Sequence, residues 1–368
     1  VSGAIWIAQQ AGYNNLLTFD MGGTSTDVSL VLNGRAAQSR ETTVGDVTVR
    51  ASSVDVRTVG AGGGSIAHVP ELTGALRVGP QSAGAEPGPA AYDKGGVEPT
   101  VTDANVALGY MPPNVRLGGD MKIRKDLAVD AVKTVADPLG LSVQAAAAGI
   151  YDIVNENMYG ALRLVSVEKG FDPRDFALIG FGGAGPLHAN ALGKLTNSWP
   201  VIIPPGPGVL CAYGDVTTTI QDEASMSFIR RFSDTNKKEV VQIFTDLSKK
   251  ASKTLDAEGV AKKNRTTTYQ VDIRYHGQGL LLTVDFDLSE LRRKGLNAIG
   301  NTFDEMHEQL FTFALPAEKE LVNLRAVVRD KALNVKAPSV PRGNYNPSGA
   351  FISKTKVFME GKNRFASL

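Results

Sequence analysis

The stretch "LLTFDMGGTSTDVSLV", residues 16–31, decides the fold of this chain. Apolar runs on both sides predict a strand over Leu16–Phe19 and a second strand over Val28–Leu32. The segment between them is rich in glycine and hydroxyl side chains, and Asp20 and Asp27 flank it. This spacing predicts either a phosphate-binding hairpin or a tight turn capped by its two aspartates.

The residues of the turn suit the first alternative. Gly22 and Gly23 allow backbone N–H groups to approach an anion, because no side chain intervenes. The hydroxyls of Thr24, Ser25 and Thr26 could add donors. A nucleotide phosphate brings Mg²⁺, which prefers one or two carboxylates plus water, and the flanking aspartates could supply them.

Two common phosphate motifs are excluded. A Walker loop ends in Gly-Lys-Ser/Thr and opens a helix, and a dinucleotide fingerprint also opens a helix. Here the chain continues as "DVSLVL", which is typical of a strand.

Composition limits the classes of function. The 368 residues predict two or more domains, and the net charge of +1 gives no strong field toward nucleic acid or a membrane. Cys211 is the one cysteine, so an intrachain disulfide is impossible and a reducing, cytoplasmic location is expected. The start has no secretory signal and no initiating Met, from which we expect a fragment or a processed chain.

Further elements follow from periodicity. We predict a strand over 47–59, a helix over 142–169 stopped by Gly170, and a short buried strand over 176–181. After "GGAGP", a helix is expected with Pro186 in its first turn.

The composition and pattern of the sequence change near Asp222. Beyond it, apolar residues at helical spacing predict a helix with a solvated lysine face, followed by a hairpin of strands 268–275 and 280–286. We therefore expect an ATPase-type domain over 1–222, an α+β region over 223–335 and a loosely ordered tail over 336–368.

Two glycine-rich segments together resemble one superfamily. Residues 16–31 look like the second phosphate loop of the actin/Hsp70/sugar-kinase ATPases, and "LIGFGGAGPLHA", residues 178–189, is similar to their adenosine loop. The expected fold is α/β: the second half of an actin-like (ribonuclease H-like) ATPase core, followed by an α+β region.

Six ordered motifs narrow the resemblance to the hydantoinase A/5-oxoprolinase family, which is related to the nucleotide-binding subunits of acetone- and acetophenone-type carboxylases. The motifs are "FDMGGTSTDVSLV", "VDVRTVGAGGGSIA", "VGPQSAGAEPGPAAY", "PTVTDAN", "VEKGFDPRDFALIGFGGAGPLHA" and "PPGPGVLCAYGD". They cover residues 2–222 densely.

The resemblance implies an ATP- and Mg²⁺-dependent hydrolase of a cyclic amide such as 5-oxoproline or hydantoin. The lactam oxygen would be phosphorylated, and a hydantoinase B-type partner subunit or domain would take part; a homo-oligomer is compatible with this. Two alternatives stay open: a non-catalytic half-core that binds a partner, and the nucleotide-binding subunit of an ATP-dependent ketone carboxylase.

The resemblance also implies roles for individual residues. Asp20 and Asp27 would organise Mg²⁺, while Gly22, Gly23, Thr24 and Ser25 would contact phosphates. The run Gly60–Ser65 would form part of the nucleotide or substrate cleft, or else a flexible turn. The remaining cofactor-binding candidates are Gly62, Gly63 and Gly64 in that run, and Gly182, Gly183, Ala184 and Gly185 along the adenosine.

The chain departs from the family pattern in two places. It lacks the family's first phosphate loop, which predicts a fragment, a reduced homologue or half of a split protein. Ala91 stands where the family often has cysteine.

Other polar residues have two interpretations each. Asp55 is either a carboxylate near the substrate or a strand-end cap, and Asp103 is either functional or an N-cap. His188 and His68 are either functional or packed residues. We expect Cys211 to be buried and inert.

The two remaining histidines, His276 and His307, are expected to be structural. None of the four histidines pairs at metal-ligand spacing.

Overall fold

The computed structural model describes residues 1–39, 42–44, 46–49, 53–112, 116–331 and 346–367. The chain divides into two compact units, one formed by Val1–Val216 with Lys336–Leu368 and the other by Thr217–Val335. Both mix helices with strands, so the protein is of mixed α/β class.

A six-stranded sheet forms the centre of the first unit. Its order is β14 (Val201–Ile202), β13 (Ala177–Phe181), β1 (Leu16–Met21), β2 (Thr26–Leu32) and β3 (Arg35–Ala36), with β8 (Val56–Val59) also paired to β2. The strands β14, β13 and β1 are parallel, whereas β1–β2 and β2–β8 are antiparallel.

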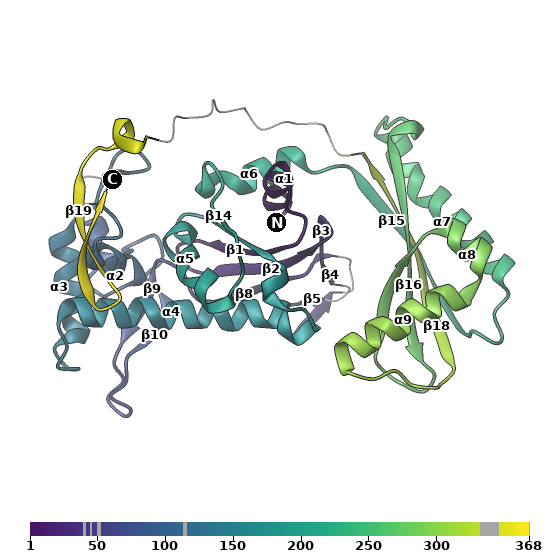
Figure 1. Cartoon of the computed structure of the whole chain (residues 1–368), viewed down its shortest axis with the longest axis horizontal. Coiled ribbons are helices and arrows are strands. Elements are labelled where there is room, and N and C mark those ends of the chain that lie inside the picture. Colours follow the sequence, from purple (N-terminus) through teal and green to yellow (C-terminus); the bar gives the residue numbers. More distant parts are fainter. Residues whose placement is uncertain (40–41, 45, 50–52, 113–115, 332–345, 368) are drawn as a thin grey trace. The chain divides into compact units, whose positions relative to one another are not determined.

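Helices cover both faces of this sheet (Figure 1). One face packs against α1 (Ser2–Gln10) and the start of α6 (Leu210–Thr217). The other packs against α4 (Val143–Val165) and α5 (Gly185–Thr196), and α2 (Val101–Leu108) packs in turn against α4. Alternation along β1 explains the split, because Leu17 and Phe19 face α4 and α5 while Leu16 faces α1.

Shorter elements complete the first unit. They are β4 (Gln38–Ser39), β5 (Thr42–Val44), β6 (Val47–Val49), β7 (Ser53–Val54), β9 (Ser65–His68), β10 (Arg77–Ser82), η1 (Ala90–Tyr92), β11 (Arg116–Leu117), β12 (Met121–Lys122), α3 (Lys125–Ala136), η2 (Val167–Lys169), η3 (Pro173–Asp175), η4 (Pro207–Val209), η6 (Pro347–Ala350), β19 (Lys354–Met359) and β20 (Lys362–Ser367).

Most of the strong periodic signals are confirmed. The expected helix over 142–169 is α4 followed by η2, and Gly170 ends it in the left-handed conformation. The predicted strand over 47–59 is different: it divides into β6, β7 and β8, and residues 50–52 lie outside the described residues. In the described parts of this segment Val47, Val49, Val54 and Val56 are exposed, so these parts have no continuous buried apolar face.

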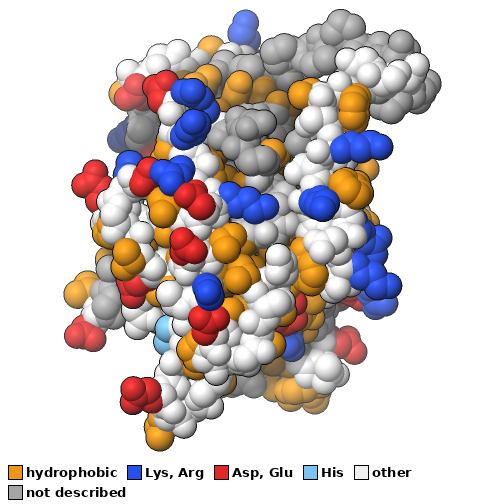
Figure 2. All heavy atoms as spheres, turned by 90° about the vertical axis from the view of Figure 1, so that its left-hand side faces the viewer, with side chains coloured by type: hydrophobic (Ala, Val, Ile, Leu, Met, Phe, Trp, Pro, Cys, Tyr) orange, Lys and Arg blue, Asp and Glu red, His pale blue; other side chains and the backbone are white. Residues whose placement is uncertain are grey.

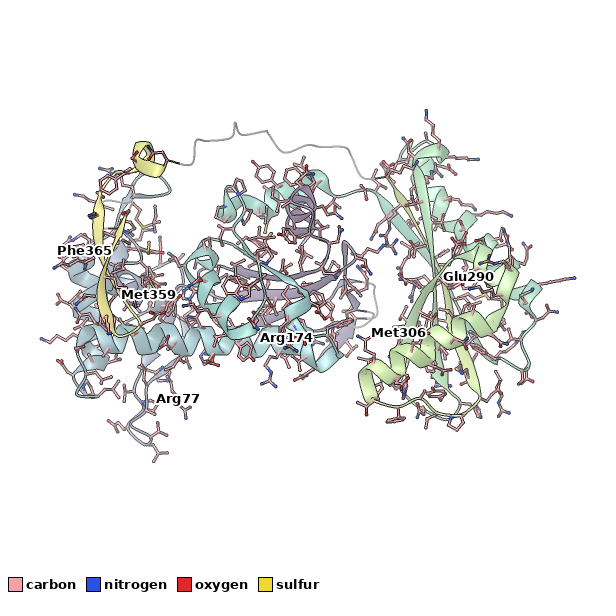
Figure 3. The ribbon with its side chains drawn as sticks, viewed as in Figure 1. Arg77, Arg174, Glu290, Met306, Met359 and Phe365 are labelled. Carbon is pink, nitrogen blue, oxygen red and sulfur yellow. The ribbon has the colours of Figure 1, made fainter. Side chains whose placement is uncertain are left out.

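The end of the chain contains a hairpin rather than a uniformly loose tail. β19 and β20 pair over six residues each, and β19 contacts α2. Figure 3 labels Met359 beside the turn and Phe365 on β20. Val357 is buried here and the half-buried Phe358 packs against the core of the first unit, so apolar side chains anchor the hairpin. Residues 336–345 and 368 lie outside the described residues.

The second unit is a four-stranded antiparallel sheet with helices on one face. Its order is β15 (Gln221–Arg231), β18 (Lys319–Asp330), β16 (Arg265–Tyr275) and β17 (Leu282–Phe286). The helices are α7 (Lys237–Ala257), α8 (Leu288–Lys294) and α9 (Leu296–Phe311), with η5 (Lys262–Asn264) before β16. The predicted helix and hairpin are thus confirmed. Asp222 lies within β15, six residues beyond Val216, where the first unit's main segment ends.

The surface shows no single-signed field on the face seen in Figure 2, where basic and acidic side chains are interspersed with apolar ones. Among the described helices, none combines the length and apolar character needed to cross a bilayer.

Candidate functional site

The glycine turn connects two strands in fixed register. Asp20 lies opposite Asp27 and Met21 opposite Thr26, so Gly22–Ser25 form the turn itself. The backbone N–H of Gly22 donates to the carbonyl of Ser25 at 3.0 Å. We call residues Gly22–Ser25 the cradle.

A second glycine loop determines where the cradle amides point. The N–H of Gly63 donates to the carbonyl of Gly22 at 3.0 Å, and the N–H of Gly64 donates to the carbonyl of Gly23 at 2.5 Å. In a planar trans peptide, the carbonyl and the following N–H point in opposite directions. The amides of Gly23 and Thr24 therefore point away from the second loop, and within the described residues they bond to no acceptor.

Only glycine fits the closest approach between the two loops. A Cβ on Gly62 would lie 2.6 Å from the backbone N and C of Thr24, well inside van der Waals contact. The residues Ala61–Ser65 are all buried, so this run is a packed support beneath the cradle. We call Gly62–Gly64 the supporting glycines.

The two flanking aspartates share one face of the sheet. Residues directly opposite on antiparallel strands have neighbouring side chains, and like charges at such positions destabilise the sheet. Asp20 and Asp27 are half-buried and exposed, respectively. A hydrated divalent cation between them would relieve this repulsion, and oxygen ligands from two carboxylates suit Mg²⁺. Within the described residues, no group of three or more His, Cys, Asp or Glu forms a denser metal site.

Each aspartate also accepts a hydrogen bond from a side chain outside the hairpin. The hydroxyl of Thr58 on β8 donates to Oδ1 of Asp27 at 2.6 Å. The thiol of Cys211 on α6 donates to Oδ2 of Asp20 at 3.3 Å. Neither contact could be predicted from the sequence, because the partners lie 31 and 191 residues apart.

The prediction that Cys211 is buried is wrong: this side chain is exposed. The apolar run around it is the start of α6, in which Leu210 and Gly214 take the buried positions. Partial burial and the neighbouring Asp20 raise the pKa of the Cys211 thiol above its usual value, so the thiol is protonated at neutral pH.

The three hydroxyls between Asp20 and Asp27 have different environments. Thr26 is fully buried and donates to the carbonyl of Ala61 at 2.5 Å, so it cannot face a ligand. Thr24 is exposed and Ser25 is half-buried. Two of the three predicted hydroxyl donors are therefore accessible.

A third glycine loop lies at the same end of the sheet. Gly182 follows β13 directly, and its φ of +83° is in the left-handed region. A Cβ there would collide with Oδ1 of Asp20 and the carbonyl of Met21, which only glycine avoids. The N–H of Ala184 donates to the carbonyl of Met21 at 2.9 Å. Gly183 is exposed and Gly185 opens α5, so this loop borders the cradle.

Asp103 has a structural environment. It is the N3 residue of a capping box with Thr100, and it also accepts the backbone N–H groups of Ala90 and Ala91 at 3.3 and 2.7 Å. Complete burial raises the pKa of this carboxyl, an effect that the hydrogen bonds partly oppose. Four hydrogen bonds occupy its two oxygens, as expected for the capping alternative.

Asp55 lies between β7 and β8 and is buried. Its carboxylate pairs with the ammonium of Lys169 and lies 3.6 Å from Nε of Arg57. The backbone carbonyl of Asp55 accepts the hydroxyl of Ser29 at 2.9 Å. This carboxylate therefore joins β8 to η2, the turn after α4.

His188 is the centre of a buried network beneath the third loop. Its Nδ1 lies 2.9 Å from Oδ1 of Asn155, and its Nε2 lies 3.1 Å from Nδ2 of Asn105. The ring stacks on Tyr151 with centroids 4.8 Å apart. Burial lowers the pKa of His188 to about 3, so the ring is neutral. The network connects α2, α4 and α5, and sequence reasoning missed both asparagines, although Asn105 ends the motif "PTVTDAN".

The other three histidines lie elsewhere. His68 is half-buried at the end of β9, opposite Arg77. His276 contacts Arg231 and Glu320 in the second unit, and His307 packs among aromatic rings there. The expectation of structural roles for His276 and His307 agrees with these contacts.

Comparisons with known proteins point to one family. The family model described as hydantoinase/oxoprolinase matches residues 1–224. Caprolactamase subunit alpha of Pseudomonas jessenii is 41% identical over 327 residues, which are 88% of this chain and 47% of that protein. The acetophenone carboxylase gamma subunit of Aromatoleum aromaticum is 34% identical over an alignment of 371 positions, which covers 97% of this chain and 50% of that protein.

A solved structure supports the same family. The crystal structure of the ATP-dependent caprolactamase from Pseudomonas jessenii matches with a TM-score of 0.88 at 37% identity, covering 97% of this chain and 52% of that chain. The chain thus spans about half the length of the curated relatives it matches. The match over more than half of the chain confirms the resemblance seen in the sequence, and the chain belongs to the hydantoinase/oxoprolinase family.

Proposed function

We propose that this chain is the nucleotide-binding part of an ATP-dependent enzyme that hydrolyses a cyclic amide, built on the second half of an actin-like ATPase core. One observation carries the proposal. The amides of Gly23 and Thr24 point outward beside two aspartates that share a face of the sheet. Unpaired amides attract phosphate oxygens, and paired carboxylates attract the accompanying cation.

Each group of residues would have its own role in binding the nucleotide. The amides of Gly23 and Thr24 and the hydroxyl of Thr24 bind phosphate oxygens. Asp20 and Asp27 would hold Mg²⁺, which would supply positive charge next to the phosphates. The loop from Gly182 to Gly185 borders the adenosine, as the resemblance implies.

ATP solves a specific chemical problem in this reaction, since an amide carbonyl is a poor electrophile. The lactam oxygen attacks the γ-phosphorus, the bond from that phosphorus to the β–γ bridging oxygen breaks, and ADP leaves. Water then adds to the activated carbon and the carbon–nitrogen bond breaks, which frees the amine and leaves an acyl phosphate. A second water hydrolyses this acyl phosphate, and the products are the carboxylate and inorganic phosphate. The cradle contributes positioning and charge stabilisation to the first step, which dominate phosphoryl transfer.

A partner completes this proposal. The name caprolactamase subunit alpha implies a further subunit in that relative, and we propose a hydantoinase B-type partner subunit or domain here. Lactam opening would depend on the assembled protein.

A second candidate is the nucleotide-binding subunit of an ATP-dependent ketone carboxylase. The acetophenone carboxylase gamma subunit supports it, because it aligns over 97% of this chain. ATP consumption that requires bicarbonate and a ketone would favour this candidate, and ATP consumption that requires a lactam would exclude it.

The first test is calorimetric titration of the chain with Mg-ATP. We expect binding that the double variant Asp20→Asn/Asp27→Asn loses. The matched control is Asp234→Asn/Asp246→Asn, which removes two exposed carboxylates in the second unit. Absence of binding at millimolar Mg-ATP, or equal binding by the double variant, would refute the nucleotide site.

A further inference from the structure

Thr58 stands in line with the two aspartates. It lies opposite Asp27 on β8, and Asp27 lies opposite Asp20 on β1. Directly opposite residues share a face, so the three side chains form a row across β1, β2 and β8. The row includes one neutral donor, the hydroxyl of Thr58.

The contact between Thr58 and Asp27 is direct. Oγ1 of Thr58 donates to Oδ1 of Asp27 at 2.6 Å, a short distance for a hydroxyl–carboxylate hydrogen bond. In the described part of the chain, Oδ2 of Asp27 accepts no hydrogen bond. The hydroxyl thus fixes one oxygen of an otherwise exposed carboxylate and leaves the other accessible.

Thr58 lies on β8, and contacts of the neighbouring Asp55 anchor this strand. Asp55 precedes β8 and is 7% exposed, and its carboxylate pairs with Lys169. The hydroxyl of Ser29 on β2 bonds to the carbonyl of Asp55 at 2.9 Å, which adds a side-chain tie between the two strands. The strand that presents the donor is therefore anchored to α4 through η2 and to the hairpin.

We propose that Thr58 is a positioning residue that orients Asp27 toward the hydrated cation. This inference rests on the proposed function, since it assumes that Asp27 serves Mg²⁺. An exposed aspartate loses rotamer freedom when it engages a cation, and a hydrogen bond made beforehand reduces that loss. The inference also gives Asp55 a role, because Asp55 anchors the strand that carries Thr58 and so acts on the site indirectly.

The test is cation affinity, measured by electron paramagnetic resonance of Mn²⁺ titrated into the full chain with ATP. Thr58→Val keeps the shape and removes the hydroxyl, and we expect Mn²⁺ affinity to fall about 3- to 10-fold, the range for a lost hydrogen bond to an ionised acceptor near solvent. Thr58→Ser restores the hydroxyl and should restore most of the affinity. ATP binding without metal should stay unchanged, because Thr58 does not contact the cradle.

A matched control is available in the second unit. Thr254 also donates to an aspartate, the half-buried Asp222, at 2.6 Å, so Thr254→Val removes a similar contact away from the site. It should leave Mn²⁺ affinity unchanged. Thr58→Ala is a second variant for the case in which valine disturbs β8, and thermal unfolding of each variant reports on folding.

The outcomes separate the two proposals. Loss of affinity in Thr58→Val with recovery in Thr58→Ser supports the inference. Wild-type affinity in Thr58→Val and Thr58→Ala, together with loss in Asp27→Asn, refutes the role of Thr58 and leaves the nucleotide site in place. Absence of Mn²⁺ binding by the wild-type chain refutes both.

Discussion

The buried His188 makes stability depend on pH in a way that can be calculated. Its pKa is lowered from 6.5 to about 3 by burial. A histidine with a depressed folded-state pKa binds its proton more readily when unfolded. Its contribution is therefore complete above pH 6.5 and is lost as the pH falls below that value.

The magnitude follows from linkage. At pH 5, an unfolded-state histidine of pKa 6.5 is about 1.5 pH units into its titration, while the folded state has taken up almost no proton. At about 1.36 kcal/mol per unit, the free energy of unfolding falls by about 2 kcal/mol between pH 7.5 and pH 5. The maximum, reached near pH 3, is about 5 kcal/mol.

Urea unfolding at several pH values measures this effect. Other groups also contribute to the pH dependence, among them Asp103, whose raised pKa acts with the opposite sign, so the quantity to compare is the difference between wild type and His188→Gln. Glutamine keeps a polar side chain and does not titrate. If both proteins lose stability equally between pH 7.5 and pH 5, or if NMR gives His188 a pKa near 6, the buried neutral histidine is refuted.

Three further predictions concern the loops, the cap and the thiol. Gly62→Ala should weaken Mg-ATP binding at least about tenfold and destabilise the chain by about 2 kcal/mol or more, since its Cβ meets the Thr24 backbone at 2.6 Å. Gly23→Ala is the control and should leave stability in urea unchanged, because nothing lies within 4 Å of the added Cβ. Equal stability of the two variants would contradict the role of Gly62 as packed support. Asp103→Ala should cost about 3 kcal/mol in urea unfolding, because it leaves the buried amides of Ala90 and Ala91 unpaired; a loss below about 1 kcal/mol would show that the cap is dispensable. Cys211 should react slowly with iodoacetamide at pH 7.5 and faster as the pH rises, because its thiol pKa is raised. Mg-ATP should protect the thiol from this reaction. Mass spectrometry measures the rate with Cys211→Ser as the blank, and a fast, pH-independent reaction would contradict the contact with Asp20.

Local signals in the sequence predicted the elements around the site. The hairpin of β1 and β2 follows from alternation on both sides of a glycine turn, and α4 follows from periodicity and the stop at Gly170. These features depend on neighbours in the chain, which periodicity reports directly. The roles of Asp20 and Asp27 stay predictions, although their register places them on one face.

Contacts between residues far apart in the chain could not be predicted from the sequence. The amide directions in the cradle depend on carbonyls turned toward Gly63 and Gly64, about 40 residues away. Cys211 was expected to be buried because its neighbours are apolar, yet helical geometry turns it outward while Leu210 faces the core. A hydropathy average over a few residues carries no information about which side of a helix each one takes.

The arrangement separates the residues that would touch a ligand from those that hold the fold. Gly23, Thr24 and Asp27 are exposed, so replacing their side chains costs little folding free energy. Gly62, Thr26, Asp103 and His188 are buried and fixed by packing or hydrogen bonds. The exposed cradle takes its shape from this buried layer, because the supporting glycines orient its peptides and Thr26 ties β2 to the carbonyl of Ala61. A variant that loses ATP binding at normal stability therefore identifies a contact residue, whereas one that loses both identifies the support.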